Sequence, residues 1–312
     1  MDRRPLGRSE IVIEPLVLGG NVFGWTVDEK TGFAILDAFV EEGFSAIDTA
    51  EGYPNWVPGN PPGMSETIIG KWMKARGNRS AVHILTKVNS ANRPGGLGAD
   101  KVAAGFDASL KRLQTDYVDV YFSHWPDPET SHEETLGAYD PMVRAGKVRV
   151  LGASNYSADM VKAAQETSVI KSLPRYEVLQ PRFNLYDRSE FAALRDTVAE
   201  HEMGTVVYYS LASGFLTGKY RSKADFGKSP RGGGVERYLD KKGTSILAAL
   251  DKVAAANDAT PAEISLAWLV AQPGVTAPIS SATSVEQVKS LAKGVRLKLS
   301  DADLQVLTEA GK

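Results

Sequence analysis

Short apolar segments recur along the chain and alternate with segments of helical period. Three of them, VHILTKV, YVDVYFSHW and GTVVYYSLA, are close to continuously apolar, which is typical of parallel strands buried on both faces. The predicted strands cover Leu16–Gly20, Phe44–Ala50, Val82–Val88, Tyr117–His124, Val148–Ala153, Val178–Arg182, Thr205–Ser210 and Thr276–Ser280. Eight strand–helix units in 312 residues match the arithmetic of a (β/α)8 TIM barrel.

The segments between these strands carry helix start and stop signals. DEKTGFAILDAFVEEG begins with acidic residues and stops at Gly43, and SETIIGKWMKARG runs from Ser65 to Gly77. Before the first strand, RPLGRSEIVIEP has a glycine-containing turn between two short extended pieces and predicts an N-terminal β-hairpin that closes the bottom of the barrel. The last segment, LSDADLQVLTEAGK, predicts a helix capped by Ser300. Residues 1–312 are therefore expected to form a single barrel domain.

The competing architecture is a doubly wound parallel sheet. Such a sheet binds a dinucleotide through G-x-G-x-x-G after its first strand. Here the first predicted strand runs into LGGNVFGW, which lacks that spacing, and the chain contains no G-x-x-x-x-G-K-[ST] either. These absences favour the barrel.

The composition limits the classes of function. The chain has no cysteine, so disulfides, thiolate catalysis and cysteine-based metal sites are excluded. A net charge of -2 gives no reason to expect nucleic acid or an anionic membrane as a partner. The N-terminal MDRRPLGRSE has no apolar core typical of a signal peptide, and no run of 18 apolar residues occurs. We expect a cytoplasmic protein.

Four proton-active side chains stand at the ends of neighbouring predicted strands: Asp48, Tyr53, Lys87 and His124. The spacings are 39 residues from Asp48 to Lys87 and 37 from Lys87 to His124, about one strand–helix unit each. Because barrel active sites lie at the C-terminal ends of the strands, these side chains are expected on one side of one rim. Each alone has a structural explanation, as a turn cap, a packed ring or an ion-pair partner, but the regular spacing favours a site.

Together the four residues suit the reduction of a carbonyl to an alcohol. Tyr53 would be a general acid for an oxygen that develops negative charge. A nearby Lys87 is expected to lower the phenol pKa, Asp48 to neutralise the lysine, and His124 to orient the substrate oxygen. No side chain supplies hydride, so a nicotinamide cofactor is implied.

Five motifs carry a family resemblance: AIDTAEGY, LTKV, DVYFSHWPD, AGKVRVLGASNYS and YYSLASGFLTGKY. Through them the chain resembles the aldo-keto reductase family over essentially its whole length. The resemblance implies reversible, NAD(P)H-dependent reduction of a small-molecule aldehyde or ketone. It also implies that Asp48, Tyr53, Lys87 and His124 are the catalytic tetrad.

The same resemblance assigns cofactor contacts. Ser154, Asn155 and Gln180 correspond to residues that bind the nicotinamide carboxamide, and Tyr208 to the tyrosine that stacks on its ring, with Tyr209 as the alternative one residue on. The remaining expected contacts are Ser210, Leu211, Ser213, Gly218 and Lys219 after the seventh strand, and Ser281, Thr283, Ser284 and Gln287 after the eighth. Many members carry Arg or Lys in the last motif, where this chain has Thr283 and Ser284. NADPH is therefore the expected cofactor with only a modest preference, and NADH remains possible.

Two further features concern the same rim. Trp25, Trp56 and Trp125 are expected to shape the substrate pocket, although loop packing would also explain each of them. The segment from Tyr220 to Gly243 is rich in glycine and basic residues and predicts a long irregular loop over the catalytic face. Two other functions remain open: a non-enzymatic cofactor-sensing partner of a membrane channel, and a metal-dependent barrel hydrolase. Four histidines, one of them at the rim, disfavour the hydrolase and lead us to expect no metal.

Overall fold

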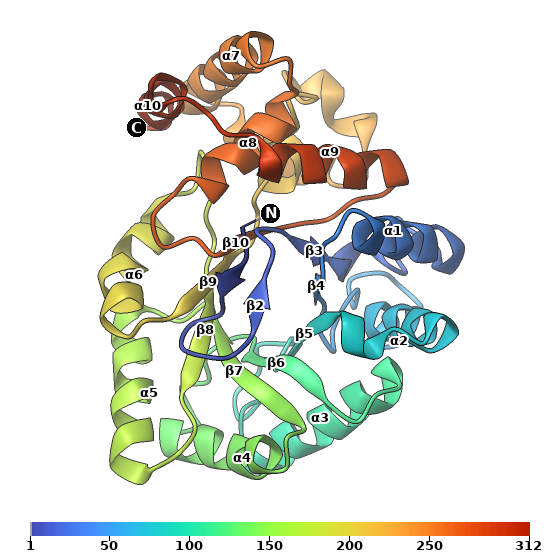
Figure 1. Cartoon of the computed structure of the whole chain (residues 1–312), viewed down its shortest axis with the longest axis vertical. Helices are drawn as coiled ribbons and strands as arrows, with labels where there is room; N and C mark the ends of the chain where they lie inside the picture. The colour runs from blue at the N-terminus through green and yellow to red at the C-terminus, as the bar shows by residue number, and fades with distance from the viewer. Residues whose placement is uncertain (1) are drawn as a thin grey trace.

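Eight parallel strands close into one barrel in a computed structural model that describes residues 2–312 (Figure 1). The strands are β3 (Val17–Gly19), β4 (Ala46–Asp48), β5 (His83–Val88), β6 (Val118–Ser123), β7 (Val148–Ser154), β8 (Tyr176–Gln180), β9 (Gly204–Val207) and β10 (Ala277–Ser280). Their order around the barrel is the chain order, and β10 pairs with both β9 and β3. The predicted TIM barrel is confirmed.

Helices surround the barrel, as Figure 1 shows. They are α1 (Glu29–Glu41), α2 (Met64–Arg76), α3 (Ala99–Leu113), α4 (His132–Arg144), α5 (Ala158–Lys171), α6 (Ser189–Glu200), α7 (Lys241–Ala256), α8 (Pro261–Val270), α9 (Val285–Arg296) and α10 (Asp301–Ala310). Ser300 caps α10 as predicted, because its side chain accepts a hydrogen bond from the Asp303 N–H. None of the helices in residues 2–312 combines the length and apolar character needed to cross a membrane.

The N-terminal hairpin is present as predicted. Strands β1 (Arg4–Pro5) and β2 (Val12–Ile13) pair antiparallel. The hairpin residues Leu6, Ile11 and Ile13 are buried in the same apolar cluster as the inward-facing residues of the barrel strands. The hairpin therefore closes the end of the barrel opposite the catalytic rim.

One apolar layer crosses the inside of the barrel above the hairpin. Every strand contributes a buried residue to the inner apolar cluster, and strands β6 and β10 add Phe122 and Ile279 two residues further on. The first contributions of the eight strands, in chain order, are Val17, Ala46, Leu85, Val120, Val150, Val178, Val206 and Ala277. We call this set the barrel floor. Because side chains alternate along a strand, the residue two positions later also faces inward and lies one layer closer to the rim. The floor thus determines which strand-end residues can meet inside the barrel.

The segment from Tyr220 to Gly243 differs from the expected irregular loop. It contains two 3-10 helices, η4 (Lys223–Lys228) and η5 (Gly232–Tyr238), and its last residues begin α7. Val235 and Tyr238 are buried, and the Tyr238 ring stacks on Phe215 at a centroid distance of 5.2 Å. These scattered apolar residues hold the segment, and their lack of a helical or strand period hid its structure from the sequence.

Candidate active site

In the layer above the barrel floor, four of the eight strands place a polar side chain inside the barrel. Counting two residues on from the floor gives Asp48 on β4, Lys87 on β5, Gln180 on β8 and Tyr208 directly after β9. The alternation of side chains therefore brings these groups together inside the barrel. Three of the four are almost fully buried, and Tyr208 packs against the inner apolar cluster.

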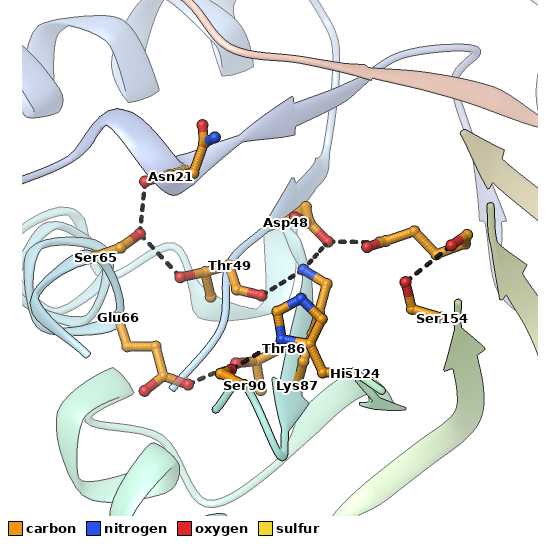
Figure 2. Close-up of polar contacts among 12 residues, drawn as sticks. Asn21, Asp48, Thr49, Ser65, Glu66, Thr86, Lys87, Ser90, His124 and Ser154 are labelled. Atoms are coloured by element: carbon orange, nitrogen blue, oxygen red, sulfur yellow. Dashed lines mark hydrogen bonds and ion pairs between the residues drawn. The ribbon is translucent and has the colours of Figure 1, made fainter. Parts of the chain in front are cut away.

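A buried ion pair forms the centre of this layer (Figure 2). Lys87 Nζ donates to Asp48 Oδ1 over 2.6 Å and to the Thr49 carbonyl oxygen over 2.8 Å. Gln180 Nε2 donates to the same Asp48 oxygen over 2.8 Å. Burial raises the pKa of Asp48 and lowers the pKa of Lys87, and the attraction between the two charges opposes both shifts. The counter-ion that the sequence indicated for Lys87 is thus Asp48.

Tyr53 lies beside this pair on the loop that follows β4. The Lys87 Nζ is 4.9 Å from the centre of the Tyr53 ring, and the ring centres of Tyr53 and His124 are 5.8 Å apart. Part of Tyr53 is accessible to solvent, but the surrounding protein desolvates the phenol. This desolvation and the negative charge of Asp48 raise the pKa of Tyr53 well above 10. The sequence led us to expect that Lys87 lowers this pKa, but in the structure desolvation is the largest influence on the phenol pKa and raises it. The phenol therefore keeps its proton at neutral pH.

His124 follows β6 and is held on three sides. Its N–H donates to the Val88 carbonyl oxygen over 2.9 Å, and its carbonyl oxygen accepts from Asn155 Nδ2 over 2.9 Å. Its ring Nδ1 lies 2.9 Å from Ser90 Oγ. Burial and the positive charge of Lys87 lower the pKa of His124 well below 6.5, so the imidazole is neutral.

The residues expected at the nicotinamide form one hydrogen-bonded chain. Tyr208 Oη donates to Asn155 Oδ1 over 2.8 Å, and Asn155 Nδ2 also lies 3.2 Å from Ser154 Oγ. Ser154 Oγ in turn donates to the Gln180 carbonyl oxygen over 2.8 Å. Tyr208 faces the barrel interior, whereas Tyr209 is 46% exposed. The geometry therefore distinguishes the two tyrosines that the sequence left open.

The turn after β9 contains several residues with left-handed backbone. Ser213, Gly214 and Gly218 have φ values of 56°, 93° and 78°. Ser210 is buried and donates to the Val207 carbonyl oxygen, and Leu211 packs partly on the outer core. A Cβ on Gly214 would lie 3.2 Å from Lys219 Nζ, so the lysine folds back over this turn.

Lys219 and Arg231 lie on this side of the rim and have no carboxylate partner in the described chain. In the segment after β9, Arg221, Lys223 and Lys228 pair with carboxylates of Asp251, Glu236 and Asp225. Among residues 2–312, no carboxylate lies within 4.0 Å of the charged groups of Lys219 or Arg231. Arg231 Nη2 instead donates to Asn21 Oδ1 over 3.3 Å. These two charges remain free for an anionic ligand.

The residues expected after β10 gather at the start of α9. Ser284 is the N-cap, and its side chain accepts from the Gln287 N–H over 3.3 Å. Gln287 Oε1 accepts from both the N–H and the hydroxyl of Thr283, over 2.8 and 3.2 Å. Ser281 lies apart from them and donates to Asn21 Oδ1 over 2.7 Å. Asn21, which both Ser281 and Arg231 contact, carried no signal in the sequence motifs.

Three tryptophans border the site. The Trp25 and Trp56 rings meet edge to face at 5.6 Å, and Trp56 meets Tyr53 at 5.9 Å. Trp125 stacks on His124 at 6.1 Å. Trp56 and Trp125 therefore lie beside the proton-active Tyr53 and His124, and Trp25 extends this aromatic border through its contact with Trp56.

The comparisons with known proteins show the family of this chain. A model of the Aldo/keto reductase family matches residues 15–312. The chain belongs to the aldo/keto reductase family. As an aldo/keto reductase it is 31% identical over 322 residues to "Uncharacterized oxidoreductase YrpG" of Bacillus subtilis, covering 99% of this chain and 95% of that protein.

Two other relatives bear on the function of this aldo/keto reductase. "Aldo-keto reductase yakc [NADP(+)]" of Schizosaccharomyces pombe is 32% identical over 258 residues, with 80% of this chain and 75% of that protein covered. "Probable voltage-gated potassium channel subunit beta" of Oryza sativa is 32% identical over 304 residues, with 92% and 89% covered. Within residues 2–312, no group of three or more His, Asp or Glu side chains could hold a metal ion.

Proposed function

We propose that this aldo/keto reductase reduces an aldehyde or ketone reversibly to the alcohol with NADPH, and that Tyr53 is the proton donor. The observation that carries the proposal is the buried Lys87–Asp48 pair next to a protonated phenol and a neutral imidazole. A charge pair in the interior is costly unless it is used or well compensated. Its position beneath Tyr53 gives it a use.

The residues at the rim fit a dinucleotide cofactor. The inward-facing Tyr208 ring, with Ser154, Asn155 and Gln180 around it, would hold the nicotinamide. The free cations Lys219 and Arg231 suit its phosphates, and Gly214 and Gly218 keep side chains away from the turn beneath them. The start of α9 at Ser284 would hold the adenosine 2'-phosphate through backbone N–H groups. Bound there, the cofactor supplies the hydride that no side chain can provide.

The chain's own residues handle the proton. Tyr53 Oη passes its proton to the carbonyl oxygen as negative charge develops there, and the phenol becomes a phenolate. The positive charge of Lys87 stabilises that phenolate, which the high resting pKa of Tyr53 would otherwise disfavour. Asp48 and the Thr49 carbonyl oxygen fix the lysine in position. In the reverse direction the phenolate takes the proton back from the alcohol.

A cofactor-sensing role without turnover is the second candidate. A relative named as a potassium channel subunit supports it. The presence of all four proton-active residues side by side at one rim favours an enzyme, since a sensor needs only the cofactor site.

Turnover of 4-nitrobenzaldehyde and a panel of ketones, followed by loss of NADPH absorbance, tests the proposal. We expect steady-state reduction by the wild type and none by Tyr53→Phe. If the wild type binds NADPH but reduces no carbonyl in the panel, the enzymatic proposal is wrong and the sensing role gains support.

A further inference from the structure

One nitrogen of the His124 ring already has a partner. Ser90 Oγ lies 2.9 Å from His124 Nδ1, within hydrogen-bonding distance. Nε2, the other ring nitrogen, has no hydrogen-bond partner among residues 2–312. The two nitrogens are therefore in different environments, and only Nε2 is free to meet a ligand.

Ser90 is fixed in place by its surroundings. Its N–H donates to Glu51 Oε1 over 3.2 Å, and Glu51 itself is tied to β5 because its N–H donates to the Lys87 carbonyl oxygen. A Cβ on Gly52 would lie 2.5 Å from Ser90 Cβ, so glycine at 52 allows this close approach. The preceding Asn89 donates to the Trp125 carbonyl oxygen, next to His124. The loop that carries Ser90 is thus fixed by hydrogen bonds and packing, and it holds the Ser90 hydroxyl next to the imidazole.

The acceptors around Ser90 bear on the direction of the Ser90–His124 hydrogen bond. Within residues 2–312, Ser90 Oγ has no other hydrogen-bond partner, and the Glu51 carboxylate accepts from the Ser90 N–H. Within the described chain, the lone pair of Nδ1 is thus the acceptor available to the hydroxyl proton. A neutral imidazole that accepts at Nδ1 carries its proton at Nε2.

We propose that Ser90 is a positioning residue that holds His124 in the Nε2–H tautomer, so that Nε2 donates a hydrogen bond to the substrate carbonyl oxygen. The inference rests on the proposed carbonyl reduction. The opposite tautomer would present the Nε2 lone pair to an oxygen that becomes negative, and the two would repel. Ser90 thus acts through His124 and does not itself touch the substrate.

The tautomer can be read directly by NMR. The chain has four histidines, so long-range ¹H–¹⁵N spectra of ¹⁵N-histidine-labelled protein are simple, and the His124→Gln variant identifies the His124 signals. We expect the wild type to show a protonated Nε2 and a bare Nδ1. Ser90→Ala is expected to show a mixture of the two tautomers. A wild type protonated at Nδ1, or a Ser90→Ala spectrum identical to it, overturns the proposal.

Kinetics give a second, independent result. Ser90→Ala is expected to lower kcat about three- to tenfold, the effect of one neutral hydrogen bond, with the NADPH dissociation constant unchanged. Ser90→Thr restores a hydroxyl and is expected to recover both the tautomer and kcat. Ser80→Ala, which removes an exposed hydroxyl without a hydrogen bond in the described chain, serves as the control.

These experiments distinguish a failure of the proposed function from a failure of the Ser90 proposal. A wild type without carbonyl turnover refutes the proposed function, but the NMR spectra still decide what Ser90 does to His124. A Ser90→Ala variant that loses kcat while keeping the Nε2–H tautomer shows that Ser90 acts in some other way, and the proposal is then wrong.

Discussion

Lys87 Nζ and Asp48 Oδ1 lie 2.6 Å apart inside the barrel, and the lysine side chain has no accessible surface. Neither charge can be removed without consequence for the other. The pair also receives a hydrogen bond from Gln180, a residue expected at the cofactor, so the charge centre and the proposed nicotinamide site share one oxygen atom of Asp48.

Lys87→Met and Asp48→Ala should both be nearly inactive but differ in stability. Asp48 can take up a proton when the lysine is lost, since burial already raises its pKa. Lys87 without Asp48 is a cation stranded in the interior. We expect Asp48→Ala to lose about 3–5 kcal/mol of unfolding free energy and Lys87→Met less. Urea unfolding at pH 7 measures both, and equal losses or the reverse order would contradict the buried pair.

Tyr53→Phe should reduce carbonyl turnover by about 10²–10⁴-fold, because it removes only the proposed proton donor. The ring and its contacts with Trp56 are kept, so NADPH affinity should stay the same. Tyr209→Phe is the matched control, since Tyr209 is exposed and faces away from the interior. A Tyr53→Phe enzyme that keeps more than about a tenth of the wild-type rate, with chemistry rate-limiting, removes Tyr53 from this role.

His124 should make stability depend on pH on the acid side. Its folded-state pKa lies below 6.5, so the unfolded chain binds a proton that the folded protein refuses. The contribution of the neutral His124 to the unfolding free energy is fully present above pH 6.5. It is lost as the pH falls toward the folded-state pKa, by up to about 1.4 kcal/mol per pH unit. His83 and His132 act in the same direction. His124→Gln should therefore flatten the decline in unfolding free energy between pH 6.5 and pH 5, and an unchanged slope would argue against a buried neutral imidazole.

Cofactor choice should favour NADPH by a modest factor. The start of α9 offers backbone N–H groups and the hydroxyls of Thr283 and Ser284, but no Arg or Lys within the motif. A charge-assisted hydrogen bond contributes about 1.5–3 kcal/mol against about 0.5–1.5 kcal/mol for a neutral one. Thr283→Arg should widen the ratio of NADH to NADPH dissociation constants about tenfold, and Thr283→Gln should not. Equal affinities of the wild type for the two cofactors, or tighter NADH, would refute the preference.

The segment from Tyr220 to Gly243 should gain protection when NADPH binds. Arg231 donates a hydrogen bond to Asn21 across the rim. Both Arg231 and Lys219 lack carboxylate partners in the described chain, so the phosphates of the cofactor are expected to bind them and order this segment. Hydrogen exchange with and without NADPH measures the effect, with the amides of α5 as an internal control. Unchanged exchange throughout the segment would mean that it takes no part in binding.

The eight strands and the rim position of the proton-active residues could be predicted because both depend on local periodicity. The strand ends differ by a few residues: β8 begins at Tyr176, not Val178, and its register with β7 shifts between Leu151 and Gly152. Choosing between Tyr208 and Tyr209 required the inward register of β9, which short apolar runs do not define.

Other features depend on contacts between distant parts of the chain. The pKa of Tyr53 depends mainly on how strongly the surrounding atoms desolvate the phenol, and the spacing of residues in the sequence does not reveal this. Ser90 meets His124 across 34 residues of sequence, and Asn21 meets Ser281 across 260. Such pairs become visible only once the barrel closes.

The barrel floor separates the part of the chain that closes the barrel from the part that carries the rim loops. The hairpin and the floor residues Val17 through Ala277 close the barrel from below without using any rim loop. The tryptophans, Ser90 and the segment after Tyr220 all lie above that layer, on connections between strands and helices. Substrate preference can therefore drift by replacement of rim loops while the foldable part of the molecule stays constant, which makes this chain a suitable scaffold for transplanting binding loops from its relatives.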